Sequence, residues 1–409
     1  MKHKIAINSA ATVQDDQLSE MNVLQYFTVT ALVLGLFFWA QDAYMAFWLR
    51  RFFIGLAGVS STYALLRFYR PTLKQLAENR LILLLALTSS LALLLSQYRE
   101  DAVFGRPLVH PSLLSLFCSI TIGLFLTTIK KDSLFKYAYN VIFGWAIISF
   151  IFWAATDIHT RLGFLDSQII YAAFLFAIGV MLGCWHYRQK TLPRQYIIGS
   201  SSFLLLCLLL SQTRSALLLL AICLVYIYRS LLFKKKAVLT IGLGATLFVI
   251  IFSSYFSRLF DYQYFVKSIE YRVNLIEASV PENPVQLLKG GGVGIIEWNI
   301  HENGHKFASL AGDTEDGIIF ESSHNYFVDI LVERGIVVLL LLIFVIFYAI
   351  KQGSTPDKYQ EFFKICLIFT CVYLFINNIN IQMEVILWAC ILLLTIRTGR
   401  GLRVDREGR

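Results

Sequence analysis

His324, in the segment SSHNYFVDILVERG, is the first candidate for chemistry, because histidine can accept and donate a proton near neutral pH. Ser322 or Ser323 is predicted to cap a helix that runs through Tyr326 and Leu331. The positive end of such a helix disfavours the imidazolium and keeps the ring neutral, which is the form that a general base needs. The alternative is an interfacial histidine that only hydrogen-bonds its own loop.

Three arginines are candidates for binding an anion. Arg214, in SQTRS, interrupts a long apolar run, so it indicates either a functional site or a side chain that snorkels to the membrane surface. Arg272, in YRVN, and Arg161, in DIHTRLGF, adjoin apolar or aromatic residues. Guanidinium groups match diphosphate oxygens bidentately, so converging arginines can hold the leaving group of a polyprenyl-diphosphate sugar. A single loop arginine is more often simply solvated.

Two further segments resemble known motifs, one for zinc and one for phosphate, but neither matches its motif fully. The string HENGH (residues 301–305) fits the zinc motif HExxH, but this motif works only on a helix, and Gly304 beside Asn303 is poor helix material. We therefore predict an incidental match and no metal site. The glycine run at 290–294 is similar to a phosphate-binding nest but lacks the P-loop pattern, so it favours a flexible turn that lets the loop fold back.

The candidate residues must be positioned by the apolar segments of the chain, which are predicted to form transmembrane helices. The chain has 409 residues, of which 57% are hydrophobic and 15% charged, and its apolar blocks have the length of about 18 to 22 residues that crosses a bilayer. Such blocks predict an all-α polytopic membrane protein of twelve spans, near 22–40, 48–66, 81–96, 112–129, 134–156, 168–186, 196–211, 215–233, 237–256, 336–350, 361–377 and 381–396. The first twenty residues are polar and do not suggest a cleaved signal peptide.

The basic residues orient these spans. The net charge of +9 arises mostly from short loops between apolar blocks, which disfavours nucleic acid as a partner. Alternation of these loops puts both chain ends in the cytoplasm. The predicted organisation is a cytoplasmic tail (1–21), nine spans (22–256), a periplasmic helical loop (257–335), three spans (336–396) and a second cytoplasmic tail (397–409).

The long loop at 257–335 differs from all other connections. Loops of this length are usually functional or disordered, and here an aromatic amphipathic run at 255–271, the helix-like YRVNLIEASV and a turn at PENP indicate short helices over the membrane surface. Seven cysteines, mostly within apolar segments and without a CxxC pattern, are predicted to be buried in lipid or to pack between helices, without disulfides or a cysteine metal site. Four aromatic residues are expected at the membrane interface: Trp39, Trp48, Trp153 and Tyr255.

Together these features resemble the O-antigen ligase family. The resemblance rests on the twelve spans, the QTR turn before a leucine-rich span, and the large periplasmic loop that ends in SSHNYFVDILVERGI. It implies a glycosyltransferase of the C type (GT-C) that is inverting, independent of metal and without a cofactor. It aligns His324 with the family's essential histidine, and Arg214, Arg272 and Arg161 with its arginines. Three neighbours are candidates for supporting the histidine: Asn325, Glu321 and Arg334.

The resemblance also implies the substrates and the place of reaction. The donor is O-antigen on undecaprenyl diphosphate, the acceptor is lipid A-core oligosaccharide, and the site faces the periplasm from the inner membrane among membrane lipids. The nearest alternative is an O-antigen or capsule polymerase that uses the same donor, followed by a protein O-oligosaccharyltransferase. A transporter or flippase is a third alternative, but it predicts charged or broken helices near the bilayer midplane in related halves of the chain.

Overall fold

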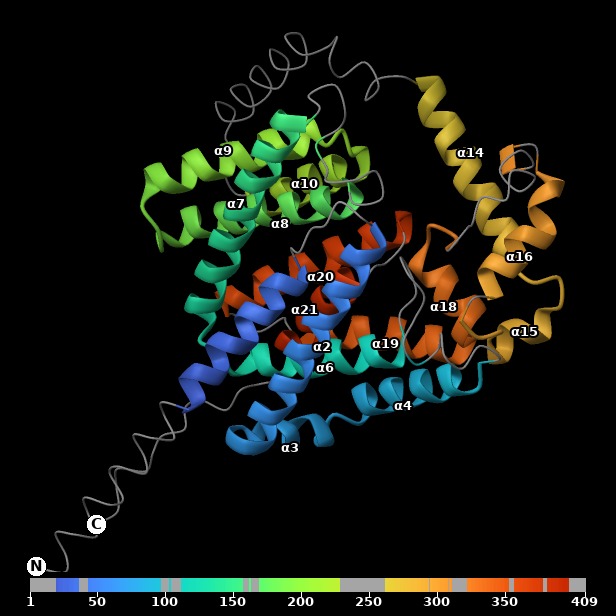
Figure 1. The fold of residues 1–409 in the computed structure, drawn as a ribbon, viewed down its shortest axis with the longest axis horizontal. Coiled ribbons are helices and arrows are strands. Elements are labelled where there is room, and N and C mark those ends of the chain that lie inside the picture. Colours follow the sequence, from blue (N-terminus) through green and yellow to red (C-terminus); the bar gives the residue numbers. More distant parts are fainter. Residues whose placement is uncertain are drawn as a thin grey trace, which may run out of the picture.

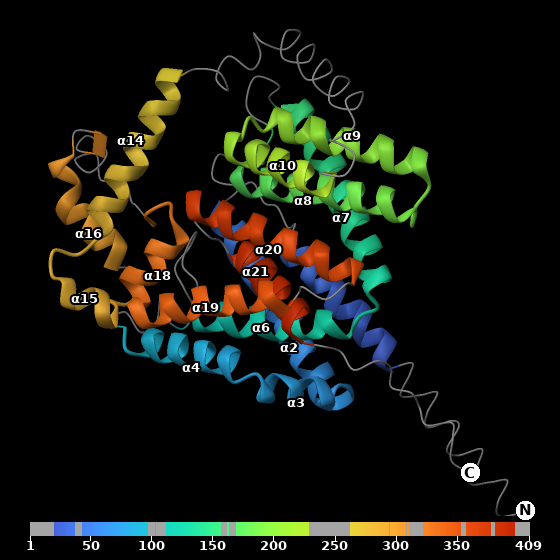
Figure 2. The ribbon, with the colours of Figure 1, turned by 180° about the vertical axis from the view of Figure 1, so that it is seen from behind.

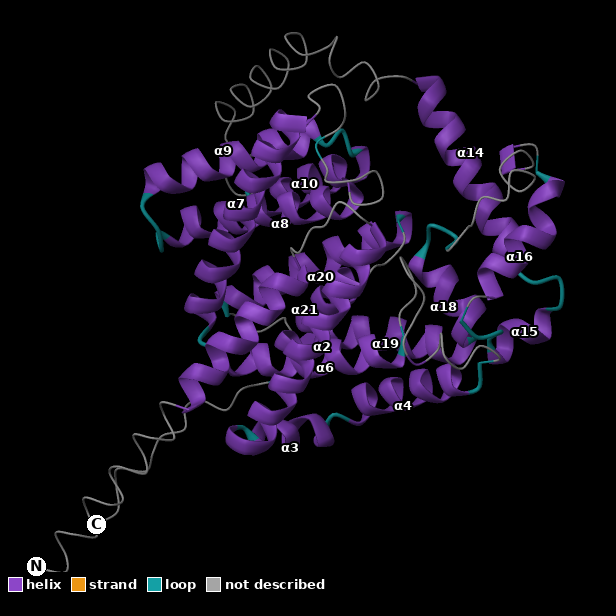
Figure 3. Cartoon of the chain, viewed as in Figure 1, coloured by secondary structure: helices purple, strands orange, loops and turns teal. Residues whose placement is uncertain are grey.

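The computed structural model describes residues 20–36, 43–96, 103, 112–156, 162, 169–228, 262–293, 295–307, 309–310, 322–352, 357–377 and 381–396. Within these ranges every regular element is a helix, as Figure 3 shows. The predicted all-helical fold class is therefore confirmed for this part of the chain. Several of these helices are strongly apolar, as a polytopic membrane protein requires.

The predicted apolar blocks coincide with helices wherever the structure describes them. The helices are Glu20–Leu36, α2 (Ala43–Phe68), α4 (Arg80–Leu94), α6 (Leu113–Thr128), α7 (Lys131–Thr156), α8 (Ile169–Gln189), α9 (Arg194–Leu210), α10 (Arg214–Ile227), α19 (Ile336–Gln352), α20 (Lys358–Ile376) and α21 (Ile381–Thr395). The ninth predicted span, 237–256, lies outside the described residues.

Length and apolar composition separate these helices into two groups. By these two criteria α7, α8 and α20 can each cross a membrane, and α2 with α3 (Arg70–Glu78) is a further candidate that bends by 100°. The other apolar helices in the described ranges are shorter. The total of twelve spans therefore stays a prediction.

One end of the helix bundle carries a separate group of helices, which we call the loop unit: α14 (Tyr262–Ser279), α15 (Pro284–Lys289), α16 (Ile295–Asn303) and α18 (Tyr326–Arg334). Figures 1 and 2 show it at one end of the bundle. Its own apolar core includes Leu275, Ile296, Ile300 and Val332, all of them buried. The predicted loop helices and the turn at PENP are thus confirmed, with Asn283 capping α15 through the N–H of Val285.

Helix ends that the charge pattern assigns to the outer side do lie together next to the loop unit. Ser115 in the first turn of α6 donates a hydrogen bond to Glu384 in the first turn of α21 (2.8 Å). Ser96, just after α4, accepts one from the N–H of Val293 in the loop unit (3.1 Å). We call this end of the bundle the loop end.

Helix ends assigned to the cytoplasm meet at the opposite end of the bundle. Lys131 at the start of α7 binds Asp357, the N-cap of α20, at 2.7 Å. Arg188 at the end of α8 lies 3.8 Å from Glu361 in the first turn of α20. The directions of these helices therefore alternate between the two ends of the bundle, and the assignment of one end to the cytoplasm stays a prediction.

The bundle core is aromatic and closely packed around α8, α20 and α21. Phe174 of α8 stacks on Phe369 of α20 with ring centroids 5.6 Å apart, and Phe369 in turn stacks on Tyr373. A Cβ added to Gly123 of α6 would stand 2.7 Å from the Leu392 side chain of α21 and 3.3 Å from the backbone of Ala389, so the glycine favours close packing of these two helices. All seven cysteines are free, and five are buried.

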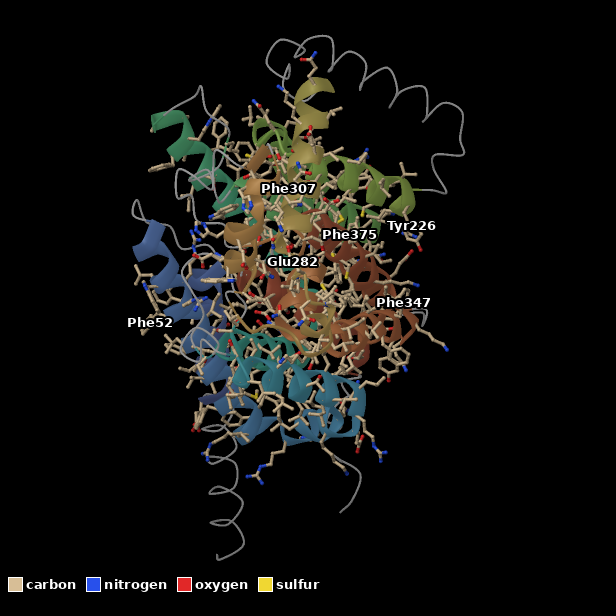
Figure 4. All side chains as sticks on the ribbon, turned by 90° about the vertical axis from the view of Figure 1, so that its right-hand side faces the viewer. Phe52, Tyr226, Glu282, Phe307, Phe347 and Phe375 are labelled. Carbon is tan, nitrogen blue, oxygen red and sulfur yellow. The ribbon has the colours of Figure 1, made fainter. Side chains whose placement is uncertain are left out.

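Exposed apolar side chains lie at the margin of the bundle, where lipid would contact them. Figure 4 looks onto the loop end and shows Phe52, Tyr226 and Phe347 at the periphery; all three are exposed. Trp48 is also exposed, at 42%. Trp153 is buried and packs on Phe150 with centroids 5.7 Å apart, and its interfacial position stays a prediction. Trp39 and Tyr255 lie outside the described residues.

Candidate active site

A network of side-chain hydrogen bonds holds the turn that carries His324. The Asp329 carboxylate accepts from the backbone N–H of Ser323 at 2.9 Å and from its hydroxyl at 2.6 Å. Ser322 accepts from the backbone N–H of His324 at 3.1 Å. The helix cap is Asn325, whose side chain accepts from the first N–H groups of α18. The prediction of Ser322 or Ser323 as the cap is therefore wrong, because these serines fix the preceding turn instead.

This network stabilises an uncommon backbone conformation. His324 has φ of 57°, in the left-handed region that costs energy for most residues other than glycine. Such conformations persist only where the surroundings over-determine them, and here Ser322, Ser323 and Asn325 supply hydrogen bonds on both sides. The direction of the imidazole is thus fixed by the turn and not by the helix that follows.

Burial and a neighbouring cation keep His324 neutral. Removal of the ring from water lowers its pKa, the positive charge of Arg272 lowers it further, and the result is a pKa of about 4. The ring is thus neutral at physiological pH, as predicted. The predicted cause was the positive end of the helix, whereas the observed causes are burial and the charge of Arg272. Among the described residues, no group forms a hydrogen bond with its buried Nδ1.

Arg272 joins the loop unit to the bundle. From α14 its Nη1 donates a hydrogen bond to the carbonyl oxygen of Ile376, the last residue of α20, at 2.9 Å. A cation at the C-terminal end of a helix is favoured by the helix dipole. This contact anchors the guanidinium close enough to His324 to act on its protonation.

Arg214 is the first residue of α10 and follows a tight turn. Gln212 has φ of 51°, and the Ser211 hydroxyl donates to the carbonyl of Leu208 at 2.6 Å, which shapes the QTR turn between α9 and α10. Arg214 is half-buried there. The first N–H groups of a helix and its dipole favour an anion at this position, and the guanidinium adds a full charge.

The end of α20 connects these two arginine sites. Asn377, directly after α20, donates its amide to the hydroxyl of Ser215, the neighbour of Arg214, at 3.4 Å. The preceding residue, Ile376, accepts from Arg272. Tyr373, one turn earlier, donates to the carbonyl of Ile170 in α8 at 2.6 Å. The structure therefore brings α10, α14 and the His324 turn to one end of α20.

Arg161 and Glu321 lie outside the described residues, and their predicted roles stay predictions. Arg334 lies within the described residues, but the electrostatic partners that the structure gives it do not include His324, which it was predicted to support. Arg334 is buried in the last turn of α18, where its charge acts on the phenol of Tyr326 and on Glu384, a fully buried carboxyl of α21. Its electrostatic partners are therefore at the junction of α18 and α21, and the charge that acts on His324 is that of Arg272.

The glycine run closes the far end of α18. The N–H groups of Gly291 and Gly292 donate to the carbonyls of Val332 and Glu333 at 2.8 and 3.0 Å. These amides are already bonded, so they do not form an anion nest. Gly290 has φ of 80°, and the loop folds back here as predicted. Gly294 lies outside the described residues.

The HENGH segment does not form the helical zinc motif. Helix α16 ends at Asn303, and a 3-10 turn, Gly304–Lys306, follows, so His301 and His305 do not share one helix. The predicted break at Asn303 and Gly304 is confirmed. Within the described ranges, no three His, Cys, Asp or Glu side chains gather as metal ligands would.

Sequence reasoning missed several residues that build the site. Ile376 contributes only a backbone carbonyl, which no side-chain pattern can reveal. The polar pair Asn377–Asn378 after an apolar run was a usable signal, since a helix end buried against other helices needs hydrogen-bonding partners. Asp329 was visible as a carboxylate in the first turn of α18, a position that favours contacts with the preceding residues.

Comparison with known proteins supports the importance of this region. Residues 199–343 match the family model described as O-Antigen ligase. The matched range begins within α9, ends within α19, and includes Arg214, Arg272 and His324. No curated protein matches the chain.

Proposed function

The chain belongs to the O-antigen ligase/polymerase superfamily, and we propose that it is the ligase, which transfers O-antigen from undecaprenyl diphosphate to a sugar hydroxyl of lipid A-core. Membership and the apolar helices make it a bacterial membrane protein with lipid-linked polysaccharide as its substrate class. The inner membrane and a periplasmic site belong to the proposal. So does the GT-C fold.

The observation that carries the proposal is a half-buried, neutral imidazole whose pKa is lowered by the charge of a guanidinium held in place by a hydrogen bond. His324 has the protonation state of a base, and Arg272 is held beside it by the end of α20. A base beside a bound cation suits a reaction in which a hydroxyl loses a proton while a nearby group gains negative charge. Transfer from a diphosphate to a sugar hydroxyl is such a reaction.

In the proposed mechanism His324 accepts the proton of the acceptor hydroxyl. The hydroxyl oxygen forms a bond to the anomeric carbon as the bond from that carbon to the diphosphate oxygen breaks on the opposite face. One displacement inverts the anomeric centre. The electron pair leaves with the diphosphate, whose added charge Arg272 and Arg214 stabilise, with Arg161 as a further proposed ligand. His324 then releases its proton to water.

No metal or cofactor has a step in this mechanism, because the arginines supply the positive charge. We expect activity of the purified protein to survive a chelator. Complete loss of activity that Zn²⁺ restores would contradict this part of the proposal and would favour the HENGH segment as a metal site.

The experiment is lipopolysaccharide profiling in a ligase-null host that makes matching O-antigen and core. The chain is expected to restore the ladder, and His324→Ala and Arg214→Ala are expected to abolish it at normal expression. Two controls are matched: His301→Ala removes an exposed histidine of the same loop unit, and Arg194→Ala removes the exposed first residue of α9 at the opposite end. Both controls should leave the ladder intact.

Two outcomes would contradict the ligase. Rough lipopolysaccharide together with longer polyprenyl-linked glycans would identify a polymerase. Failure of both reactions with a matched acceptor would contradict glycosyl transfer itself.

A further inference from the structure

The loop unit contains a polar cavity that the proposed reaction does not use. It has a volume of about 380 Å³ and lies between the end of α14, the start of α15, helix α16 and the 3-10 turn Gly304–Lys306. Small-molecule sites typically have about 300–1,000 Å³. Figure 4 shows Glu282, which lines it, and Phe307, which follows the 3-10 turn, on the side of the loop unit that faces the viewer.

An indole forms one wall of this cavity. Trp298 is 58% exposed, although tryptophan is usually well buried in a water-facing domain. Its Nε1 donates to Glu302 at 3.1 Å, one turn further along α16. This bond fixes the plane of the ring while its face remains accessible. The indole therefore presents an apolar face to the cavity beside polar side chains.

Charged and amide side chains surround the indole in a fixed arrangement. Lys306 binds Glu282 at 2.6 Å and the side-chain oxygen of Asn303 at 2.7 Å. Asn299 donates its amide to the carbonyl of Ser279 at 2.8 Å, which ties α16 to the end of α14. The polar groups are therefore positioned before any ligand binds, which lowers the entropy cost of binding.

The chemistry of this lining selects among ligands. Two carboxylates, Glu282 and Glu302, outnumber the single ammonium of Lys306 around the cavity, so a phosphate or another anion is disfavoured. A ligand must offer an apolar face to Trp298 and many hydroxyls to the carboxylates and amides. A pyranose ring has both, because its C–H groups form a face and its hydroxyls project from the edge.

We propose that this cavity is a glycan-binding subsite in which Trp298 stacks on a sugar ring of the polysaccharide. The inference rests on the proposed glycosyl transfer, since the glycan is that of the donor or of the acceptor. Ser279, whose carbonyl accepts from Asn299 of the cavity lining, follows Arg272 by seven residues on α14, so at 1.5 Å per residue roughly 10 Å of helix separates the two residues. A short stretch of polysaccharide bridges that separation.

The test measures binding without turnover. Full-length protein in lipid nanodiscs is titrated with two probes that mild acid releases from lipopolysaccharide of the bacterium carrying this chain: core oligosaccharide alone, from rough molecules, and core that carries O-polysaccharide, from smooth molecules. Isothermal titration calorimetry gives Kd. Binding of either probe supports the subsite. Binding of core alone identifies the acceptor as the source, whereas binding of only the core that carries O-polysaccharide identifies the donor.

Variants locate the binding. Trp298→Ala is expected to weaken Kd about tenfold or more, whereas Trp298→Phe keeps an aromatic face and most of the affinity. Glu302→Gln is expected to weaken binding less, because its amide oxygen can still accept from the indole N–H. His301→Ala is the matched control, since it lies on the same helix but does not line the cavity.

Failure of the subsite is distinguishable from failure of the proposed function. Unchanged Kd in Trp298→Ala, or no binding of either probe by the wild type, would overturn the subsite even if the ladder assay succeeds. Conversely, His324→Ala is expected to bind the glycan normally while it ligates nothing. If the chain binds glycan through Trp298 but restores no ladder, the subsite is supported and the proposed ligase function is contradicted.

Discussion

Acidification provides a quantitative test of His324 as the base. Its pKa falls from the ordinary value of 6.5 to about 4. At about 1.4 kcal/mol per pH unit this difference corresponds to about 3 kcal/mol of preference for the neutral ring. At pH 5.5 a base with a pKa of about 4 is about 97% neutral, whereas one with the ordinary value is only about 9% neutral. Since only the neutral ring accepts a proton, the rate should hardly change between pH 7.5 and 5.5 and should fall tenfold per unit below about pH 4.

The assay is the pH dependence of kcat/KM for ligation by protein in nanodiscs, because this quantity reports the free enzyme. The profile of kcat reports the substrate complex and should differ. A bound diphosphate neutralises the charge of Arg272, which is one of the two causes that lower the pKa of His324. The acid limb of kcat is therefore expected at higher pH than that of kcat/KM.

A direct titration separates protonation from catalysis. The His324 signal in histidine-labelled protein, assigned by its loss in His324→Gln, should titrate near pH 4, and Arg272→Gln should move it upward. A His324 signal that titrates near 6.5, or a tenfold fall of kcat/KM between pH 7.5 and 5.5, would refute the argument from burial.

Three further predictions concern single substitutions. Arg272→Lys should retain part of the activity that Arg272→Ala loses by at least 100-fold, because lysine keeps the charge but not the bidentate geometry, as kcat/KM will show. Gly290→Ala should lower the free energy of unfolding by about 1–3 kcal/mol, since its φ of 80° is strained for alanine and the methyl would stand 2.8 Å from Cα of Arg334. Glu384→Leu should lower the free energy of unfolding by about 1–3 kcal/mol, because it leaves the buried hydroxyl of Ser115 without its acceptor. Denaturant melts in detergent will measure this, and an unaltered midpoint would contradict it.

Local sequence information determined the helices of this protein and their directions. An apolar block long enough for a bilayer forms a helix because lipid leaves no other partner for its backbone groups. The short basic loops predicted that successive helices run in alternating directions, and contacts such as that of Lys131 with Asp357 agree with this prediction. The resemblance to a family also identified His324, Arg214 and Arg272 as candidates before any distance was known.

Only the tertiary structure decided how these residues meet. The low pKa of His324 depends on burial and on Arg272 from another helix, and neither is encoded in the residues beside it. Trp153 is buried although an apolar span gives no sign of which face packs inward. The cavity beside Trp298 likewise arises where α15, α16 and the 3-10 turn Gly304–Lys306 converge. Periodicity describes one element at a time, whereas burial, charge coupling and cavities arise from the packing of elements that lie far apart in the chain.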